Sequence, residues 1–283
     1  MSERQVAEKV FLWPDGRIPL QMGTEPERLV ERTPNDGIVR LTDINRPYFR
    51  FFRTPRKGAC PVVVVMPGGG DEFLAWNLEG AEVAAWLNTL GCSAAVLAYR
   101  VPNQREAALC DAQRTVGLLR HKAGQYGVDP HKVGVIGFSA GANLAVRLST
   151  NWRHRAYAEV DAADDYPCRP DFQMVIYPWD IRPRKDALSA DGGWEGDLLR
   201  ADYPVDGETP PAFVVQAEDD WCESATARAY DQALRQSGVA SETRIYVRGG
   251  HGFGLRKQGK PSDKWPLDAA VWLQRVMSGG FQR

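Results

Sequence analysis

The chain has 283 residues, of which 43% are hydrophobic and 25% are charged, proportions that are typical of a globular protein with a sizeable core. Its 35 Lys and Arg residues nearly balance its 36 Asp and Glu residues, and the formal net charge is −1. Because nucleic acid and anionic membranes attract proteins with a basic excess, we expect neither as a partner, and the charge balance favours a small neutral ligand.

The cysteines and the amino-terminal residues indicate the cellular compartment in which the protein is expected. The cysteines are odd in number and widely spaced, and no CxxC pair suggests zinc binding or thiol redox chemistry. The opening residues carry scattered charges in place of the apolar core of a secretory signal, and no stretch approaches the roughly 20 apolar residues that span a bilayer. We therefore expect a reducing, cytoplasmic location. The five cysteines are Cys60, Cys92, Cys110, Cys168 and Cys222.

Residues 1–58 are rich in Pro, Gly, Arg and Asp, and their short alternating segments, 38–41 and 48–52, predict edge strands among loops. From residue 60, continuous apolar runs alternate with amphipathic helical patterns. Such a sequence predicts one α/β domain over residues 1–283, with a largely parallel sheet covered on both faces. The predicted strands are 62–66, 94–98, 133–136, 174–177, 213–215 and 243–247, and the predicted helices are 79–90, 105–123, 140–149, 224–237 and 264–277.

The stretch 180–211 breaks this rhythm. It is polar and rich in Gly, Pro and Asp, and residues 194–200 offer one short helical pattern. We expect an insertion over the carboxyl edge of the sheet, above the active site.

The motif GFSAG, residues 137–141, follows an apolar strand and precedes a helical pattern. The GxSxG spacing predicts a tight strand-to-helix turn that exposes the Ser139 hydroxyl as a nucleophile, where a merely structural turn is the alternative. The helix that begins there directs free N–H groups at the reacting atoms, so the Ala140 N–H is a candidate oxyanion donor.

A serine nucleophile needs a base, and His251, in RGGHGFG after the last predicted strand, is where the order Ser, acid, His places it. The other three histidines fit surface positions. The acid that orients the imidazole is expected after the preceding strand, where AEDDW supplies two neighbours. Counting from the strand favours Asp220, with Asp219 as the alternative and a helix N-cap as the structural explanation of either.

MPGGG, residues 66–70, ends the first parallel strand. Consecutive glycines let backbone N–H groups approach a substrate without interference from side chains, so Gly69 and Gly70 are candidate oxyanion donors. A plain tight turn and a phosphate-binding loop are the alternatives. The second lacks the Lys-Ser/Thr pair that should follow it.

Four stretches together resemble the α/β-hydrolase family, in its esterase branch with a PGGG or HGGG loop, and are most similar to acetyl xylan esterase-like carbohydrate esterases. The resemblance covers about residues 60–256 and implies a mostly parallel central sheet of about eight strands with helices on both faces. It also implies a serine mechanism without metal or cofactor, in which an acyl-enzyme forms on Ser139 and small acyl groups such as acetyl are removed from sugars. The stretches are PGGG with NLEGAEVAAWLNTLG, VLAYRVP with DAQRTVGLLR, GVIGFSAGANLA, and QAEDD with RGGHGFG.

Tryptophans in the loops could offer flat faces to a sugar or aryl group, although buried packing also explains them. Trp179 and Trp221 are the binding candidates, and Trp194 lies in the expected insertion. Four charged residues match family positions, and we expect them to form ion pairs that anchor helices to the sheet: Glu79, Arg100, Asp111 and Arg114.

The leading hypothesis is a serine esterase acting on a small-molecule ester, with an acetylated sugar as the candidate substrate. One alternative keeps the same residues but cleaves amide, formamide or aryl ester bonds, as in a peptidase or an arylformamidase. Another is a non-catalytic binding protein on the same scaffold, which usually lacks one of the three catalytic residues.

Overall fold

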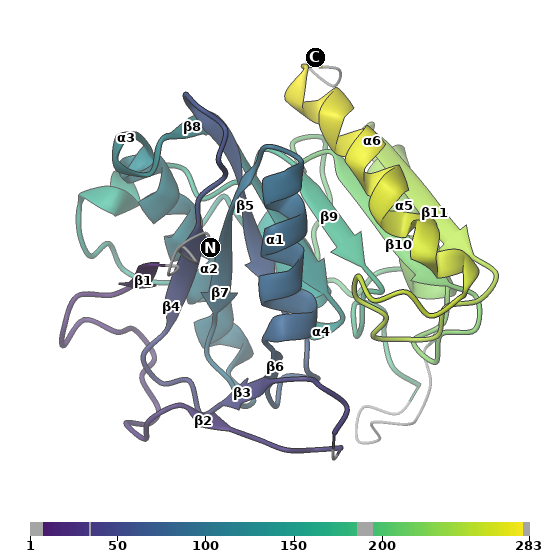
Figure 1. The fold of residues 1–283 in the computed structure, drawn as a ribbon, viewed down its shortest axis with the longest axis horizontal. Coiled ribbons are helices and arrows are strands. Elements are labelled where there is room, and N and C mark those ends of the chain that lie inside the picture. The colour runs from purple at the N-terminus through teal and green to yellow at the C-terminus, as the bar shows by residue number, and fades with distance from the viewer. Residues whose placement is uncertain (1–7, 34, 186–194, 280–283) are drawn as a thin grey trace, which may run out of the picture.

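The apolar runs of the sequence form the parallel part of an eight-stranded sheet in the computed structural model, which describes residues 8–33, 35–185 and 195–279 (Figure 1). The sheet order is β1-β4-β7-β5-β8-β9-β10-β11. β4 pairs antiparallel with both β1 and β7, and all other neighbours are parallel, so the predicted mostly parallel sheet is confirmed. The strands are β1 (Glu8–Phe11), β4 (Tyr48–Phe52), β5 (Cys60–Met66), β7 (Ser93–Ala98), β8 (Val128–Phe138), β9 (Gln173–Ile176), β10 (Ala212–Ala217) and β11 (Ser241–Tyr246).

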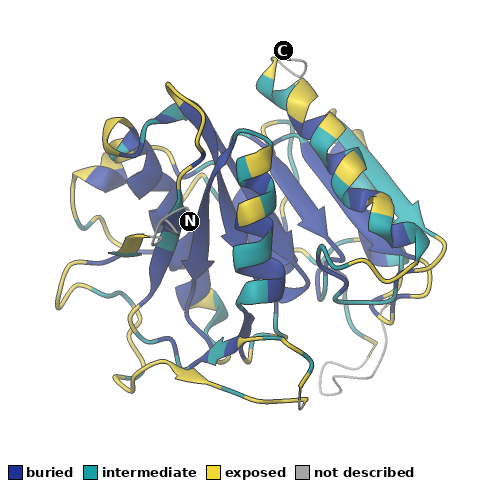
Figure 2. Cartoon of the chain, in the orientation of Figure 1, coloured by how far each residue is buried: buried dark blue, intermediate teal, exposed yellow. Residues whose placement is uncertain are grey.

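The central strands are apolar throughout because both of their faces are covered. In β5, Val62 and Val64 pack into one core cluster, while Val63 and Val65 pack into the cluster on the opposite face. Figure 2 shows the result, a buried sheet between helices whose outer stripes are exposed.

The helices divide between the two faces. α1 and α6 share a core cluster on one face, and α2, α4 and α5 contribute to the clusters on the other. The helices are α1 (Glu82–Thr89), α2 (Arg105–His121), α3 (Ala123–Tyr126), α4 (Ala140–Thr150), α5 (Ala225–Gln236) and α6 (Trp265–Met277), with short helical turns η1 (Asn77–Ala81), η2 (Ala162–Asp165) and η3 (Pro261–Lys264).

The amino-terminal segment builds a second sheet of three antiparallel strands, β2 (Arg28–Leu29), β3 (Arg40–Thr42) and β6 (Leu74–Ala75). β6 lies just after the glycine loop, so this small sheet fastens the first part of the chain to the loop. The Thr42 hydroxyl strengthens the attachment by donating to the carbonyl of Glu72 at 2.6 Å.

Three predictions about elements are wrong. The predicted edge strand at 38–41 appears as β3, which lies between β2 and β6 in the small sheet. Residues 48–52 form an internal strand instead of an edge, because β1, which the sequence did not predict, pairs with its outer side. Residues 195–200 form no helix. Gly196 adopts a positive φ of 62° there, and its carbonyl accepts from the buried guanidinium of Arg182 at 2.9 Å. Trp194, where that helix was expected to begin, lies outside the described residues.

All five cysteines are buried and unpaired. Within the described ranges, no helix combines the length and the hydropathy that a bilayer crossing requires.

Candidate active site

Ser139 occupies the turn between β8 and α4 and has strained backbone angles, φ 52° and ψ −117°. The two glycines of the motif are required by close packing. A Cβ on Gly137 would lie 2.1 Å from the carbonyl oxygen of Gly141, and one on Gly141 would lie 2.0 Å from that of Met66. The turn therefore forms only with glycine on each side of the serine, as GxSxG requires.

His251 and Asp220 meet Ser139 at the carboxyl edge of the sheet. The distance from His251 Nε2 to Ser139 Oγ is 2.7 Å, and both carboxylate oxygens of Asp220 lie 3.0 Å from His251 Nδ1. Asp220 follows β10 and His251 follows β11, so three parallel strands deliver the three side chains. A hydrogen-bonded chain of this kind can pass a proton from the hydroxyl to the imidazole.

The two neighbouring aspartates have separate roles. Asp220 is 5% exposed, and it also accepts from the Gln216 side chain at 2.9 Å and from the Cys222 N–H at 2.8 Å. Asp219 is exposed and accepts from the N–H groups of Gly249 and Gly250, each at 2.7 Å. These backbone hydrogen bonds, that of Gly250 first, hold the pKa of Asp219 below its usual value. Asp220 thus contacts the histidine, and Asp219 caps the loop that carries it.

The glycine loop lies directly beside the serine. A Cβ on Gly68 would sit 2.8 Å from Ser139 Cβ, and the Gly68 N–H is already used, because it donates to Glu79 Oε2 at 2.7 Å. Gly69 has a φ of 148°, and a Cβ there would lie 1.9 Å from the carbonyl oxygen of Phe73. Gly70 has a φ of 65° and borders open space. The Gly69, Gly70 and Ala140 N–H groups therefore remain the candidate oxyanion donors.

The two candidate tryptophans differ in environment. Trp221 is 61% exposed, and its ring centroid lies 5.0 Å from that of His251. Trp179 is half-buried under two guanidinium groups, with Arg105 at 5.2 Å and Arg184 at 5.3 Å from its ring centroid. Trp221 thus presents a free aromatic face beside the site, while arginines already contact the ring of Trp179.

The sequence did not predict the ion pairs around Arg105. This residue pairs with Asp71, just after the glycine loop, and with Asp180 at 2.6 Å, in the loop that follows β9. Asn143 of α4 also holds that loop, by donating to the carbonyls of Trp179 and Asp180. No local pattern marks these contacts, since they join segments far apart in the chain.

The expected ion pairs are confirmed only in part. Arg100 and Asp111 form a buried pair with an N–O distance of 2.9 Å, whereas Arg114 pairs with Asp164 at 3.0 Å. The prediction for Glu79 is wrong, because among the described residues it pairs with no Lys or Arg and accepts instead from Gly68 and Tyr177.

One group of metal-ligand type lies within the site. Oxygen, sulfur and nitrogen atoms of Asp220, Cys222 and His251 lie within 4.8 Å of one another. Burial, and next the charge of Asp220, raises the pKa of the Cys222 thiol well above its usual range, and a protonated thiol is a poor ligand. Since His251 Nδ1 already has Asp220 as its hydrogen-bond partner, this group fits proton transfer better than metal binding.

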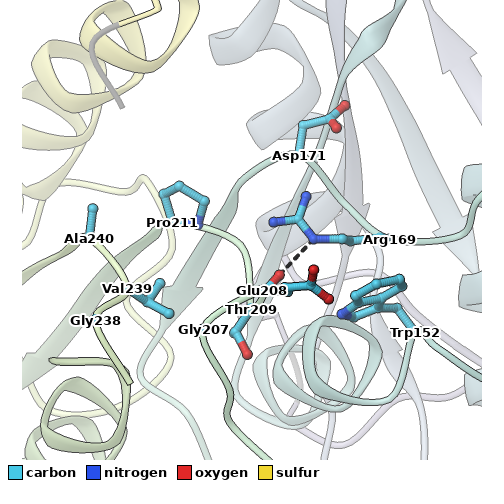
Figure 3. A pocket seen from close by; sticks show the side chains of 10 residues that line it. All are labelled: Trp152, Arg169, Asp171, Gly207, Glu208, Thr209, Pro211, Gly238, Val239 and Ala240. Carbon is cyan, nitrogen blue, oxygen red and sulfur yellow. Dashed lines mark hydrogen bonds between the residues drawn. The ribbon is translucent and has the colours of Figure 1, made fainter. Parts of the chain in front are cut away.

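A separate cavity of about 560 Å³ lies at the amino ends of the parallel strands, opposite the end that carries Ser139 (Figure 3). Its lining includes Asp171, Pro211 and Ala240, which precede β9, β10 and β11 at their amino ends, so it is remote from Ser139. Trp152 and Arg169 form one of its walls.

Comparisons with known proteins agree with this architecture. The BD-FAE family model matches residues 51–173. The acetylxylan esterase of Xylanibacter ruminicola is 27% identical over an alignment of 237 residues that covers 78% of this chain but only 47% of that protein. The chain thus spans about half the length of this curated relative.

Two solved structures share the fold. An acetyl ester-xyloside bifunctional hydrolase from Caldicellulosiruptor lactoaceticus superposes with a TM-score of 0.77 and 27% identity, covering 97% of this chain and 98% of that one. A thermophilic esterase from Thermogutta terrifontis superposes with a TM-score of 0.69 at 18% identity, covering 85% and 93% of the two chains. Sheet order, serine turn and solved structures together show that the chain has the α/β-hydrolase fold, and its sequence is similar to that of an acetylxylan esterase.

Proposed function

We propose that the protein is a serine carboxylic ester hydrolase that removes small acyl groups, acetyl above all, from carbohydrate esters. The observation that carries this proposal is the hydrogen-bonded chain from Ser139 Oγ through His251 to Asp220, with steps of 2.7 and 3.0 Å. The likeness to an acetylxylan esterase and to an acetyl ester-xyloside hydrolase supports the acetyl and carbohydrate parts.

In the first half of the reaction, Ser139 Oγ attacks the ester carbonyl carbon while His251 Nε2 takes the hydroxyl proton. The negative charge moves to the carbonyl oxygen, and the Gly69, Gly70 and Ala140 N–H groups are the candidate donors that stabilise it. Asp220 stabilises the imidazolium and holds the ring in place. The C–O bond to the alcohol then breaks, the alcohol leaves with the proton from His251, and an acyl-enzyme remains.

In the second half, His251 takes a proton from water as the water oxygen attacks the acyl carbon. The tetrahedral intermediate collapses, the bond to Ser139 Oγ breaks, and His251 returns the proton to the serine. The products are the free acid and the regenerated hydroxyl. This chain of residues supplies every proton transfer without a cofactor or metal, in keeping with the serine mechanism.

The exposed ring of Trp221 supports a role in binding the leaving group, because it stands beside His251, which must deliver a proton to that group. A sugar ring fits such a face, and so does an aryl group. Aryl esters and formamides are therefore the second candidate substrates. The buried, unpaired cysteines support a reducing compartment such as the cytoplasm.

The test is acetate release by the purified protein from acetylated xylo-oligosaccharides, alongside turnover of p-nitrophenyl acetate in the same buffer. We expect both to be cleaved, with the higher kcat/KM for the sugar ester, because binding energy from the glycan is used in the transition state. Cleavage of the activated ester alone would reject the carbohydrate part, and a series of aryl ester, amide and formamide substrates would then define the bond. Cleavage of none of these would reject the hydrolase proposal.

A further inference from the structure

Glu79 is a buried carboxyl group for which the proposed reaction has no direct use. It lies in η1, is 4% exposed, and accepts two hydrogen bonds, from the Gly68 N–H and from the Tyr177 hydroxyl, both at 2.7 Å. Burial raises its pKa, and the two hydrogen bonds oppose that rise. A buried carboxyl that pairs with no Lys or Arg among the described residues is costly, and its two hydrogen bonds offset part of that cost.

Tyr177, whose hydroxyl donates to Glu79, links Glu79 to the loop that carries His251. It directly follows β9, is fully buried, and has a positive φ of 40°. Its hydroxyl donates to Glu79 and accepts from the Gly254 N–H at 3.2 Å. Its ring also packs edge-on against His251, at 5.0 Å between centroids, and against Phe253 at 4.5 Å. Tyr177 therefore contacts the histidine loop through both its ring and its hydroxyl.

Gly68, in the glycine loop, is the other hydrogen-bond partner of Glu79. Space for a Cβ is absent there, with the Phe138 carbonyl oxygen at 2.4 Å and Ser139 Cβ at 2.8 Å. Gly68 is wedged against the serine turn, and the bond from its N–H to Glu79 holds the residue that precedes the candidate donor Gly69. One chain of hydrogen bonds thus runs from the glycine loop through Glu79 and Tyr177 to the loop that carries His251.

We propose that Glu79 and Tyr177 are positioning residues that lock the glycine loop and the His251 loop to each other on the two sides of Ser139. Neither residue touches the substrate. Their effect is on geometry, because the oxyanion donor and the base must both be correctly placed around one reacting carbon, and a displacement of about 1 Å can cost about 100-fold in rate. The effect on turnover rests on the proposed function, but the connection between the loops can be measured without it.

Hydrogen–deuterium exchange tests the connection directly. In Tyr177→Phe, the Gly254 amide loses its acceptor, and Glu79, which accepts from the Gly68 amide, loses its hydrogen bond to Tyr177. We expect exchange to accelerate about tenfold or more in peptides covering both 67–73 and 250–256. Exchange that changes less than twofold in the peptide containing Gly68 would overturn the proposal, since the two loops would then move independently.

The matched control is Tyr126→Phe. Tyr126 is also buried, and within the described part of the chain its hydroxyl has no hydrogen-bond partner. Its ring packs against Phe49 and Phe51 at the far side of the sheet. This variant should leave exchange in both loops and all kinetic constants unchanged, which separates loss of the Tyr177 hydroxyl from loss of a buried tyrosine hydroxyl in general.

Turnover of p-nitrophenyl acetate is the second readout. We expect Tyr177→Phe to lower kcat about 10-fold to 100-fold while KM stays within about threefold, because positioning acts on the transition state. Glu79→Gln, which keeps one acceptor oxygen, should lose less. The kcat of the double variant should be no lower than that of the more impaired single variant, since both residues act through the same chain of hydrogen bonds.

The outcomes separate the two proposals. Folded variants with kcat within twofold of the wild type would overturn the positioning role even where exchange accelerates. A wild-type protein that cleaves no ester would reject the proposed function, and the exchange measurement alone would then decide whether the loops are locked. If Tyr177→Phe does not fold, hydrogen–deuterium exchange and p-nitrophenyl acetate turnover are both measured on Glu79→Gln instead.

Discussion

Nε2 of His251 lies 2.7 Å from Oγ of Ser139 although the two residues are 112 positions apart in the chain. The contact follows from strand order. β8, β10 and β11 run parallel, so the loops at their carboxyl ends share one edge of the sheet and bring Ser139, Asp220 and His251 together. The local sequence supplies the residue types, and the sheet supplies their meeting point.

Replacing Ser139 with Ala should abolish ester turnover, because no other hydroxyl stands within reach of His251 Nε2 in the described site. The thermal midpoint should not fall, since alanine fits the same turn and only the hydroxyl is removed. Turnover of p-nitrophenyl acetate and a melting curve check both. Retention of near wild-type rate would show that another group is the nucleophile.

Asp220→Asn should reduce kcat by about 10⁴-fold, because an amide donates where the imidazole needs an acceptor. Asp219→Asn should reduce it far less, since asparagine can still accept from the Gly249 and Gly250 N–H groups. Steady-state kinetics of the two variants at one pH make the comparison. Equal small losses would mean that neither carboxylate supports the histidine.

The charge of Asp219 should contribute to stability in a pH-dependent way. Its pKa in the folded chain lies below the usual 3.8, so its contribution is fully present well above pH 3.8 and is lost as pH falls through the folded-state pKa. The difference in unfolding free energy between the wild type and Asp219→Asn should therefore shrink as pH falls from 7 to about 3. Urea unfolding at several pH values measures it, and a difference independent of pH would rule out the charge as its source.

Gly69→Ala should impair catalysis beyond its effect on stability. The new Cβ would collide with the Phe73 carbonyl oxygen, 1.9 Å away, so the loop must shift beside Ser139. We expect kcat to fall about 100-fold, the scale of losing one oxyanion donor. Gly238→Ala is the matched control, because it has a positive φ of 72° with open space around it and lies at the end of α5. It should lower stability by about 1 kcal/mol and leave kcat unchanged.

Asp111→Ala should destabilise the fold by about 3–5 kcal/mol, because it leaves the fully buried guanidinium of Arg100 without its carboxylate. Denaturant unfolding checks this value. Arg153→Ala, which breaks an exposed pair with Asp206, should barely move the transition midpoint. Similar losses in the two variants would mean that burial does not govern the strength of these pairs here.

Sequence patterns predicted most of the sheet and the serine turn because both depend on local rules, namely continuous apolar runs and the GxSxG spacing. They failed where distant segments decide. β4 is internal only because β1 pairs with its outer side. Glu79 forms no ion pair among the described residues, and its carboxylate accepts instead from Tyr177, 98 positions away. Tyr177 directly follows an ordinary buried strand, and no sequence pattern marks its hydroxyl as the donor to Glu79.

The small sheet of β2, β3 and β6 has a consequence for engineering. It joins β2 and β3 to the segment that immediately follows the glycine loop, and the Trp76 N–H reinforces this attachment by donating to the Val39 carbonyl at 2.8 Å. β2 and β3, which contribute no side chain to the proposed proton transfer, thus support the glycine loop from outside. Mutant libraries aimed at substrate range can therefore target this small sheet and leave the glycines and the serine turn intact.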